Sequence, residues 1–112
     1  MSTISWEDFE KIDIRIGTVL RAEEFPEARN PSFKVWVDFG EKIGIKKTSA
    51  QITDYYDIQT LVGRQVVGVV NFPPRQIGPF MSEFLLTGFY TEEGGVVLAA
   101  PERTVQNGAK FG

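Results

Sequence analysis

One stretch organises this chain: residues 69–86 read VVNFPPRQIGPFMSEFLL. Two apolar runs bound it, 66–70 and 83–87, and each predicts a buried strand. The prolines between them fix φ and remove amide donors, so the segment cannot simply continue the ladder. A stiff loop also holds apolar side chains at a surface with little ordering cost on binding. The loop is therefore either a binding rim or a cover over the end of its own barrel, and the spacing alone leaves both open.

Alternating apolar and polar residues predict further strands before this stretch. Gly17 lies inside the first alternating run and predicts a bulge or a sharp bend there. Trp36 lies on the polar side of the second run. It is a stacking platform, a subunit contact or a side chain packed under a loop. The predicted strands are 12–20, 33–39, 43–49, 66–70 and 83–87.

Two short helices are expected between these strands and at the start of the chain. Ser5 precedes an acidic residue by three positions, which predicts a capped helix with Trp6 and Phe9 facing inward. Residues 51–62 predict one or two helical turns that end near Gly63. Five strands with a helical connector between the third and fourth predict a small closed barrel, and the OB-fold has this order. Periodicity alone also permits another small barrel or a sandwich.

The composition predicts one domain covering residues 1–112, with 42% hydrophobic and 24% charged residues. No apolar run approaches the ~20 residues of a membrane span, and the first residues do not resemble a secretory signal. We therefore expect a cytoplasmic protein without membrane insertion. The absence of cysteine and histidine removes the usual nucleophile pairs and the ordinary zinc site. We expect no enzyme activity, no catalytic residue, no metal and no cofactor.

Charge is distributed unevenly along the chain. The net charge of −3 argues against a generic nucleic-acid binder, whose affinity would depend on neutralising phosphates. Residues 28–75, however, carry 7 cations against 4 acids, and the remainder carries 5 cations against 11 acids. A basic face on an acidic protein and a mixed solvated surface both account for these counts.

Several motifs, in this order, resemble the tRNA-binding domain family of OB-folds. They are DIRIG at 13–17, VNFPPR at 70–75, SE at 82–83, VVL at 96–98 and NG at 107–108. The likeness extends from about Phe9 to Gly112. It implies an all-β chain with short helices, folded as a five-stranded OB-fold barrel with N- and C-terminal extensions.

Within that family, four segments resemble the CsaA group of export-related chaperones: FPEAR at 25–29, DFG at 38–40, SAQIT at 49–53 and VVNFPP at 69–74. This resemblance implies a cytoplasmic homodimer that binds unfolded or preprotein polypeptides, with the export machinery as a further partner. The terminal segments are expected near the dimer interface. Structure-based recognition of tRNA is the alternative function. Phe25, Ala50 and Phe84 replace more polar or compact family residues, and these departures favour a protein ligand.

Two sets of site residues follow from the loop chemistry and the resemblance. The expected polypeptide groove is lined by Phe72, Ile77, Phe80 and Trp36. The expected tRNA-binding set is Lys34, Lys42, Lys46, Lys47, Ser49, Asn71, Arg75 and Ser82. Arg75 suits phosphate or carboxylate, and Ser49 is a short donor and acceptor. Asn71 and Ser82 are either binding groups of the same kind or caps for the strands that the loop joins.

Overall fold

The structure is a computed structural model, and it describes residues 2–112. Its helices are α1 (Trp6–Glu10) and α2 (Ile58–Leu61). Its strands are β1 (Ile14–Glu24), β2 (Phe33–Asp38), β3 (Ile45–Ala50), β4 (Gln65–Val69), β5 (Arg75–Ile77), β6 (Phe80–Ser82), β7 (Leu85–Leu86), β8 (Gly88–Tyr90) and β9 (Val96–Leu98). No helix within residues 2–112 is long and apolar enough to cross a membrane.

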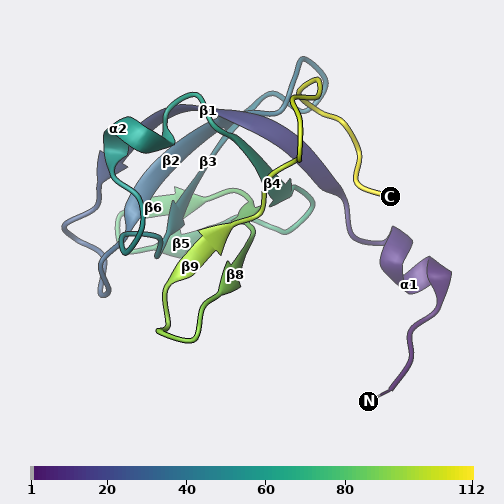
Figure 1. The fold of residues 1–112 in the computed structure, drawn as a ribbon, viewed down its shortest axis with the longest axis horizontal. Helices are drawn as coiled ribbons and strands as arrows, with labels where there is room; N and C mark the ends of the chain where they lie inside the picture. The colour runs from purple at the N-terminus through teal and green to yellow at the C-terminus, as the bar shows by residue number, and fades with distance from the viewer. Residues whose placement is uncertain (1) are drawn as a thin grey trace.

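Five antiparallel strands form a nearly closed barrel, in the order β3-β2-β1-β4-β7 (Figure 1). The segment between β6 and β7 closes the barrel against β3. There the Glu83 amide donates to the Lys47 carbonyl at 2.8 Å, and the Thr48 hydroxyl donates to the Phe84 carbonyl at 2.7 Å. With α2 between β3 and β4, this confirms the predicted all-β, five-stranded OB-fold with short helices.

Strand β1 is long and bent, so it pairs with β4 through one half and with β2 through the other. Gly17 allows the close approach at the bend, because a Cβ there would lie 2.4 Å from Val37 Cγ1 and 2.9 Å from the Asp38 carbonyl oxygen. The register shift falls three residues later, between Val19 and Arg21. The predicted bend at Gly17 is therefore confirmed, and the bulge lies at Leu20 instead.

The barrel interior is filled from the inward face of each strand. Strand β2 alternates buried and half-buried positions along its whole length, as its sequence predicted. The largest fully buried side chains are Phe39, Leu61, Val19, Val35, Val37 and Val66. The rings of Phe39 and Phe84 meet edge to face, with centroids 5.0 Å apart. This packed core fixes the outward positions of the same strands, from which the candidate site is built.

The proline-rich loop contains a small hairpin that sequence analysis did not predict. Strand β5 pairs with β6, and Gly78 between them has a φ of +56°. The prolines lie just before β5 and in the turn, outside the paired residues. They therefore stiffen the ends of the hairpin without removing its ladder hydrogen bonds.

Both termini extend the barrel. The predicted capping box is present, since the Asp8 amide donates to Ser5 Oγ and the Ser5 amide to Asp8 Oδ2, each at 3.1 Å. The prediction that Trp6 faces inward is wrong, because its side chain is 66% exposed and α1 projects from the barrel (Figure 1). The helix is too short to reach the core. The C-terminal tail pairs with β1 through the Ile14 carbonyl, which accepts from the Phe111 amide at 2.9 Å.

Candidate functional site

The outer side of strands β1, β2 and β3 carries a cluster of cationic and aromatic side chains. Side chains alternate across a strand, so the outward residues of β2 lie opposite outward residues of both neighbours. In the register, Trp36 faces Arg21 on one side and Lys47 on the other, while Lys34 faces Glu23 and Ser49. We call this surface the sheet face. Its residues are Arg21, Glu23, Lys34, Trp36, Lys47 and Ser49.

The β5–β6 hairpin covers part of the sheet face. The ring of Phe80 packs against Trp36 and Phe25, with centroids 5.9 and 5.5 Å apart. Ser82 Oγ accepts a hydrogen bond from the Ser49 amide at 3.0 Å, which holds the hairpin to β3. As a result Phe80 is only 7% exposed. The loop was expected to be either a binding rim or a cover over its own barrel, and Phe80 belongs to a cover.

Three cations of the sheet face lie over aromatic rings. Arg21 Cζ is 4.1 Å from the Trp36 centroid, and the Nζ atoms of Lys34 and Lys47 are 5.3 and 5.1 Å from the Phe80 centroid. Lys34 Nζ is also 4.9 Å from the ring of Phe25. Cations within ~6 Å of a ring centroid are attracted by the ring quadrupole. These aromatic rings therefore restrict the positions of the three charged groups.

These cations differ in whether they have an acidic partner. Arg21 is paired with Glu23, whose Oε2 accepts from Arg21 Nε at 2.7 Å. Within residues 2–112, no carboxylate lies within 4.0 Å of the ammonium of Lys34 or Lys47. The sheet face therefore presents two ammonium groups without a neutralising carboxylate, next to an aromatic cluster, which suits a polyanionic ligand.

Other residues of the predicted tRNA set lie at or beyond the edge of the sheet face. Lys46 points to the opposite side of β3 from Lys47, because the two are consecutive in the strand. Lys42 lies in the exposed turn after β2. Arg75 is exposed on β5, opposite Ser82, where it can reach a ligand on the sheet face.

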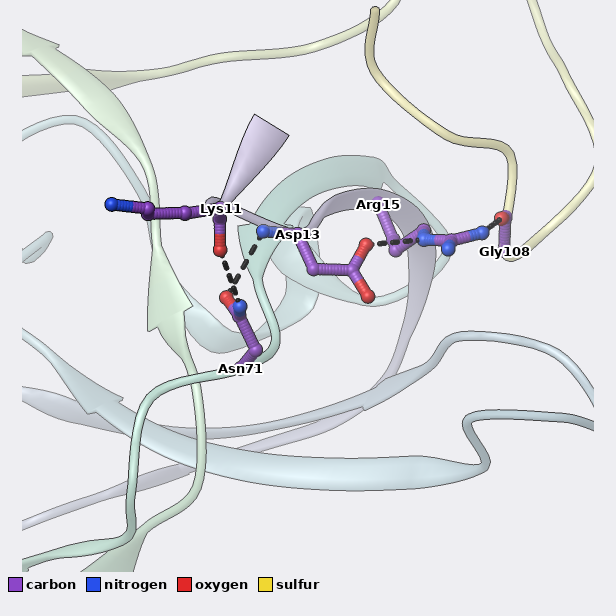
Figure 2. Close-up of polar contacts among 5 residues, drawn as sticks. All are labelled: Lys11, Asp13, Arg15, Asn71 and Gly108. Carbon is purple, nitrogen blue, oxygen red and sulfur yellow. Dashed lines mark hydrogen bonds and ion pairs between the residues drawn. The ribbon is translucent and has the colours of Figure 1, made fainter. Parts of the chain in front are cut away.

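Asn71 is occupied by contacts within the chain (Figure 2). Its Oδ1 accepts from the Asp13 amide at 3.0 Å, and its Nδ2 donates to the Lys11 carbonyl at 2.7 Å. Arg15 continues the network, since its Nε donates to Asp13 Oδ1 at 2.6 Å and its Nη1 to the Gly108 carbonyl at 3.0 Å. Asn71 therefore ties the start of the proline loop to the segment before β1. This is the capping arrangement, and a direct role in RNA binding stays a prediction.

The residues predicted to line a polypeptide groove are not equally accessible. Trp36, Ile77 and Phe80 lie where the hairpin packs on the sheet: Ile77 pairs with Phe80 across the hairpin, and Trp36 lies beneath Arg21 and beside Phe80. Phe72 is 54% exposed. Phe72 is therefore the member most available to a ligand, and the groove itself stays a prediction.

A second surface is formed by the terminal segments, which were expected near a dimer interface. The rings of Trp6 and Phe9 are 5.5 Å apart, and those of Phe9 and Phe111 are 6.2 Å apart. From Phe111 the row continues across the sheet through Ile14, Val69 and Leu85, which are neighbours in the strand register. Val69 is covered, at 6% exposed, whereas Leu85 is 49% exposed. We call this row the terminal apolar face. Its register across β1, β4 and β7 brings together residues far apart in the sequence, so no local pattern could have predicted it.

The β8–β9 hairpin adds exposed apolar side chains that sequence analysis missed. Phe89 and Val97 are paired across the hairpin, and they are 68% and 43% exposed. The only signal in the sequence was the aromatic pair at 89–90, outside any long alternating run. Among residues 2–112, no group of three or more acidic, histidine or cysteine side chains is placed to hold a metal ion.

Comparison with known proteins identifies the family. The family described as "Putative tRNA binding domain" matches residues 14–110. The chain belongs to the tRNA-binding domain family. That family is a binding domain and not a catalytic fold. The methionine–tRNA ligase of Methanocaldococcus jannaschii is 30% identical over 98% of this chain, but the match covers only 16% of the ligase.

Two solved structures place the chain more closely within the family. The chaperone CsaA from Bacillus anthracis is 47% identical, with a TM-score of 0.93 over 99% of this chain and 100% of that one. The CsaA chaperone protein from Picrophilus torridus is 42% identical, with a TM-score of 0.92 over 98% of this chain and 100% of that one. The resemblance to the CsaA group is confirmed.

Proposed function

We propose that this chain is a CsaA-like chaperone that binds unfolded or preprotein polypeptides. Exposed apolar side chains carry this proposal: Trp6, Phe72, Leu85, Phe89 and Phe111 are each between 49% and 68% exposed. Extended apolar surface on a folded domain marks a site for another protein or a membrane. The similarity to chaperone CsaA over the whole chain supports the protein ligand. The proposal also includes a cytoplasmic location and the export machinery as a further partner.

A homodimer is part of this proposal. The terminal apolar face combines both chain ends, and a symmetric pair would bring the same patch of each copy together. Sedimentation at micromolar concentration should then give about twice the 12.6 kDa mass of one chain. Trp6→Ala with Phe111→Ala should shift the protein toward monomer. A single 12.6 kDa species for the unaltered protein would contradict the dimer.

Capture of an unfolded polypeptide tests the chaperone proposal. Permanently unfolded, carboxymethylated α-lactalbumin is a suitable probe, because it exposes apolar segments and cannot refold. We expect binding that depends weakly on salt and weakens by about 5- to 30-fold in Phe72→Ala, as for an interface anchor worth 1–2 kcal/mol. Arg103→Ala, at an exposed position paired only with its neighbour Glu102, is the matched control. No binding of the unaltered protein to this probe would refute the proposal.

A second candidate function is recognition of tRNA by its structure. It is favoured by the sheet face, where Lys34 and Lys47 have no acidic partner within residues 2–112. Phosphate contacts release counterions, so this binding should weaken steeply as salt is raised. Titration of tRNA at several salt concentrations measures the slope. Affinity for tRNA that does not change with salt would contradict binding through this face.

A further inference from the structure

The ring of Phe80 is covered and lies close to two lysine ammonium groups, which is not the arrangement expected of a side chain that contacts a polypeptide ligand. Its side chain is 7% exposed, so it offers little surface to a ligand. Two ammonium groups from different strands approach its ring, Lys34 Nζ at 5.3 Å and Lys47 Nζ at 5.1 Å. Both lysines project from neighbouring strands, and the one ring attracts both ammonium groups.

Within residues 2–112, no carboxylate forms an ion pair with either ammonium group. Glu23 is opposite Lys34 in the register, but its Oε2 accepts from Arg21. Glu83, near β3, uses its Oε1 to accept from the Lys47 backbone amide at 3.0 Å. Both neighbouring carboxylates are therefore oriented by other groups, and the two ammonium groups retain donors for an external anion.

We propose that Phe80 is a positioning residue that holds Lys34 and Lys47 as a paired ammonium site for one RNA phosphate. This inference rests on the proposed tRNA function and names the group that performs part of it. A phosphodiester has two free oxygens, so it can accept one charge-assisted hydrogen bond from each ammonium. Ser49, opposite Lys34 in the register, adds a hydroxyl donor beside the pair.

The ring lowers the cost of binding by ordering the lysines in advance. Free lysine side chains lose much rotamer freedom when a ligand fixes them. Here the ring already restricts both, so less ordering is left for the ligand to impose. Phe80 would therefore contribute to RNA affinity without touching RNA and without carrying charge.

Phe80→Leu tests the role of the ring, because it keeps an apolar side chain and leaves the net charge unchanged. At low salt we expect tRNA affinity to fall about 5- to 30-fold, because the ligand must then order two lysine side chains that the ring no longer restricts. Phe39→Leu is the matched control. It removes a ring from the core, where Phe39 packs against Phe84, and it should bind tRNA as the parent does once both variants are shown to be folded by their melting curves.

Lys34→Met with Lys47→Met tests whether the ring acts through the lysines. Because both ammonium groups serve one phosphate, the slope of log affinity against log salt should fall by about 0.7–0.9, not by twice that amount. In this double variant, adding Phe80→Leu should cost less than about twofold, since the groups it positions are gone. In the parent, the Lys47 Hε resonances should be shifted by the ring current of Phe80, and Phe80→Leu should remove that shift. The Lys34 Hε resonances should keep part of theirs, because Lys34 Nζ also lies 4.9 Å from the ring of Phe25.

The outcomes separate this inference from the function on which it rests. A parent that binds no tRNA overturns the tRNA proposal itself. If the parent binds tRNA, and Phe80→Leu has the same tRNA affinity as the parent or as Phe39→Leu, only the role of Phe80 is overturned. Full additivity of Phe80→Leu with the lysine changes also overturns it. Equal binding of poly-glutamate and tRNA, lost together in the lysine variant, would assign the site to acidic polypeptide and overturn the RNA assignment.

Discussion

The sheet face and the terminal apolar face share strand β1 but differ in how exposed their aromatic side chains are. On the sheet face, Phe80 is 7% exposed beneath two lysines, whereas on the terminal apolar face Trp6 is 66% exposed and has no cation over it within residues 2–112. Buried rings support charged groups, and bare rings offer apolar area to another protein. The same residue type therefore points to a polyanion on one surface and to a polypeptide on the other.

The proline loop, residues 69–86, lies between these two faces. Its hairpin contributes Phe80 to the sheet face, and its first residues are tied by Asn71 to the segment leading into β1. Phe72 lies between these two attachments and remains 54% exposed. Two phenylalanines that looked alike in the sequence thus belong to different surfaces, and replacing them should have different effects.

The largest expected effect is on stability, in Phe80→Ala. Truncating a buried phenylalanine removes apolar burial and leaves a cavity, which costs about 3 kcal/mol of unfolding free energy. Phe72→Ala, at an exposed site, should cost less than about 0.5 kcal/mol. Urea denaturation of both variants measures the difference. If the two losses were equal, Phe80 would not be the covered residue of the pair, and the contrast between the faces would fail at this point.

The next effect concerns the link between the faces, in Asn71→Ala. Loss of the side-chain amide leaves the Asp13 amide and the Lys11 carbonyl without this partner, which should cost about 1 kcal/mol. Affinity for tRNA should stay within about twofold of the parent, because both polar ends of Asn71 are used inside the chain. Asn71→Asp keeps the acceptor for the Asp13 amide but places a carboxylate oxygen against the Lys11 carbonyl, so it should lose at least as much stability. A large fall in tRNA affinity with unchanged stability would instead make Asn71 a direct RNA contact.

Much of the fold could be predicted from the sequence because its signals are local. The alternation in residues 33–39 determines which side chains of β2 enter the core, and the Ser5–Asp8 spacing determines the helix cap. The β5–β6 hairpin was missed because prolines argue against strands, although here they flank the paired residues. Trp6 was placed inward because a helical apolar side chain usually packs on its own domain, and a five-residue helix outside the barrel does not.

The candidate site was harder to predict for a related reason. Charge counts identified Lys34 and Lys47 as candidates. They did not show that Lys47 and not Lys46 lies on the sheet face, and only the alternation of side chains along a strand distinguishes the two. The contact of Phe80 with Trp36 depends on how the hairpin at residues 75–82 folds over strand β2, some forty residues earlier in the chain. Such a contact has no local signal. The use of Asn71 as a cap was one of two predicted alternatives, and only the positions of Asp13 and Lys11 decide it.

A smaller effect should separate neighbouring lysines on β3. Lys47→Glu removes an ammonium group from the sheet face and adds a charge that repels phosphate, so tRNA affinity at low salt should fall several-fold. Lys46→Glu changes the net charge equally but points to the other side of the strand, and it should cost much less. Salt titrations of both variants provide the comparison. Equal losses would mean that overall charge, and not the sheet face, determines RNA binding.

The smallest expected effect is on the terminal apolar face and depends on pH. The pKa of Asp8 is lowered from its ordinary value of 3.8, first by the hydrogen bond from the Ser5 amide, then by the Ser5 hydroxyl, with a smaller contribution from Lys11. A lowered pKa in the folded state means that the cap contributes fully above the unfolded value and is lost as pH falls through the folded one. Helix α1, and with it the position of Trp6, should therefore loosen only in strong acid.

Asp8→Asn should reproduce that loosening at neutral pH, because it removes the carboxylate from the cap. We expect the dimer to dissociate about twofold more readily, a small change because the carboxylate is fully solvated. Glu7→Gln is the matched control, since it removes the same charge from the same helical turn without touching the capping box. Sedimentation of both variants at neutral pH makes the comparison. If Glu7→Gln weakened the dimer as much as Asp8→Asn, the effect would come from helix charge in general, and the Ser5–Asp8 cap would have no special part in presenting this face.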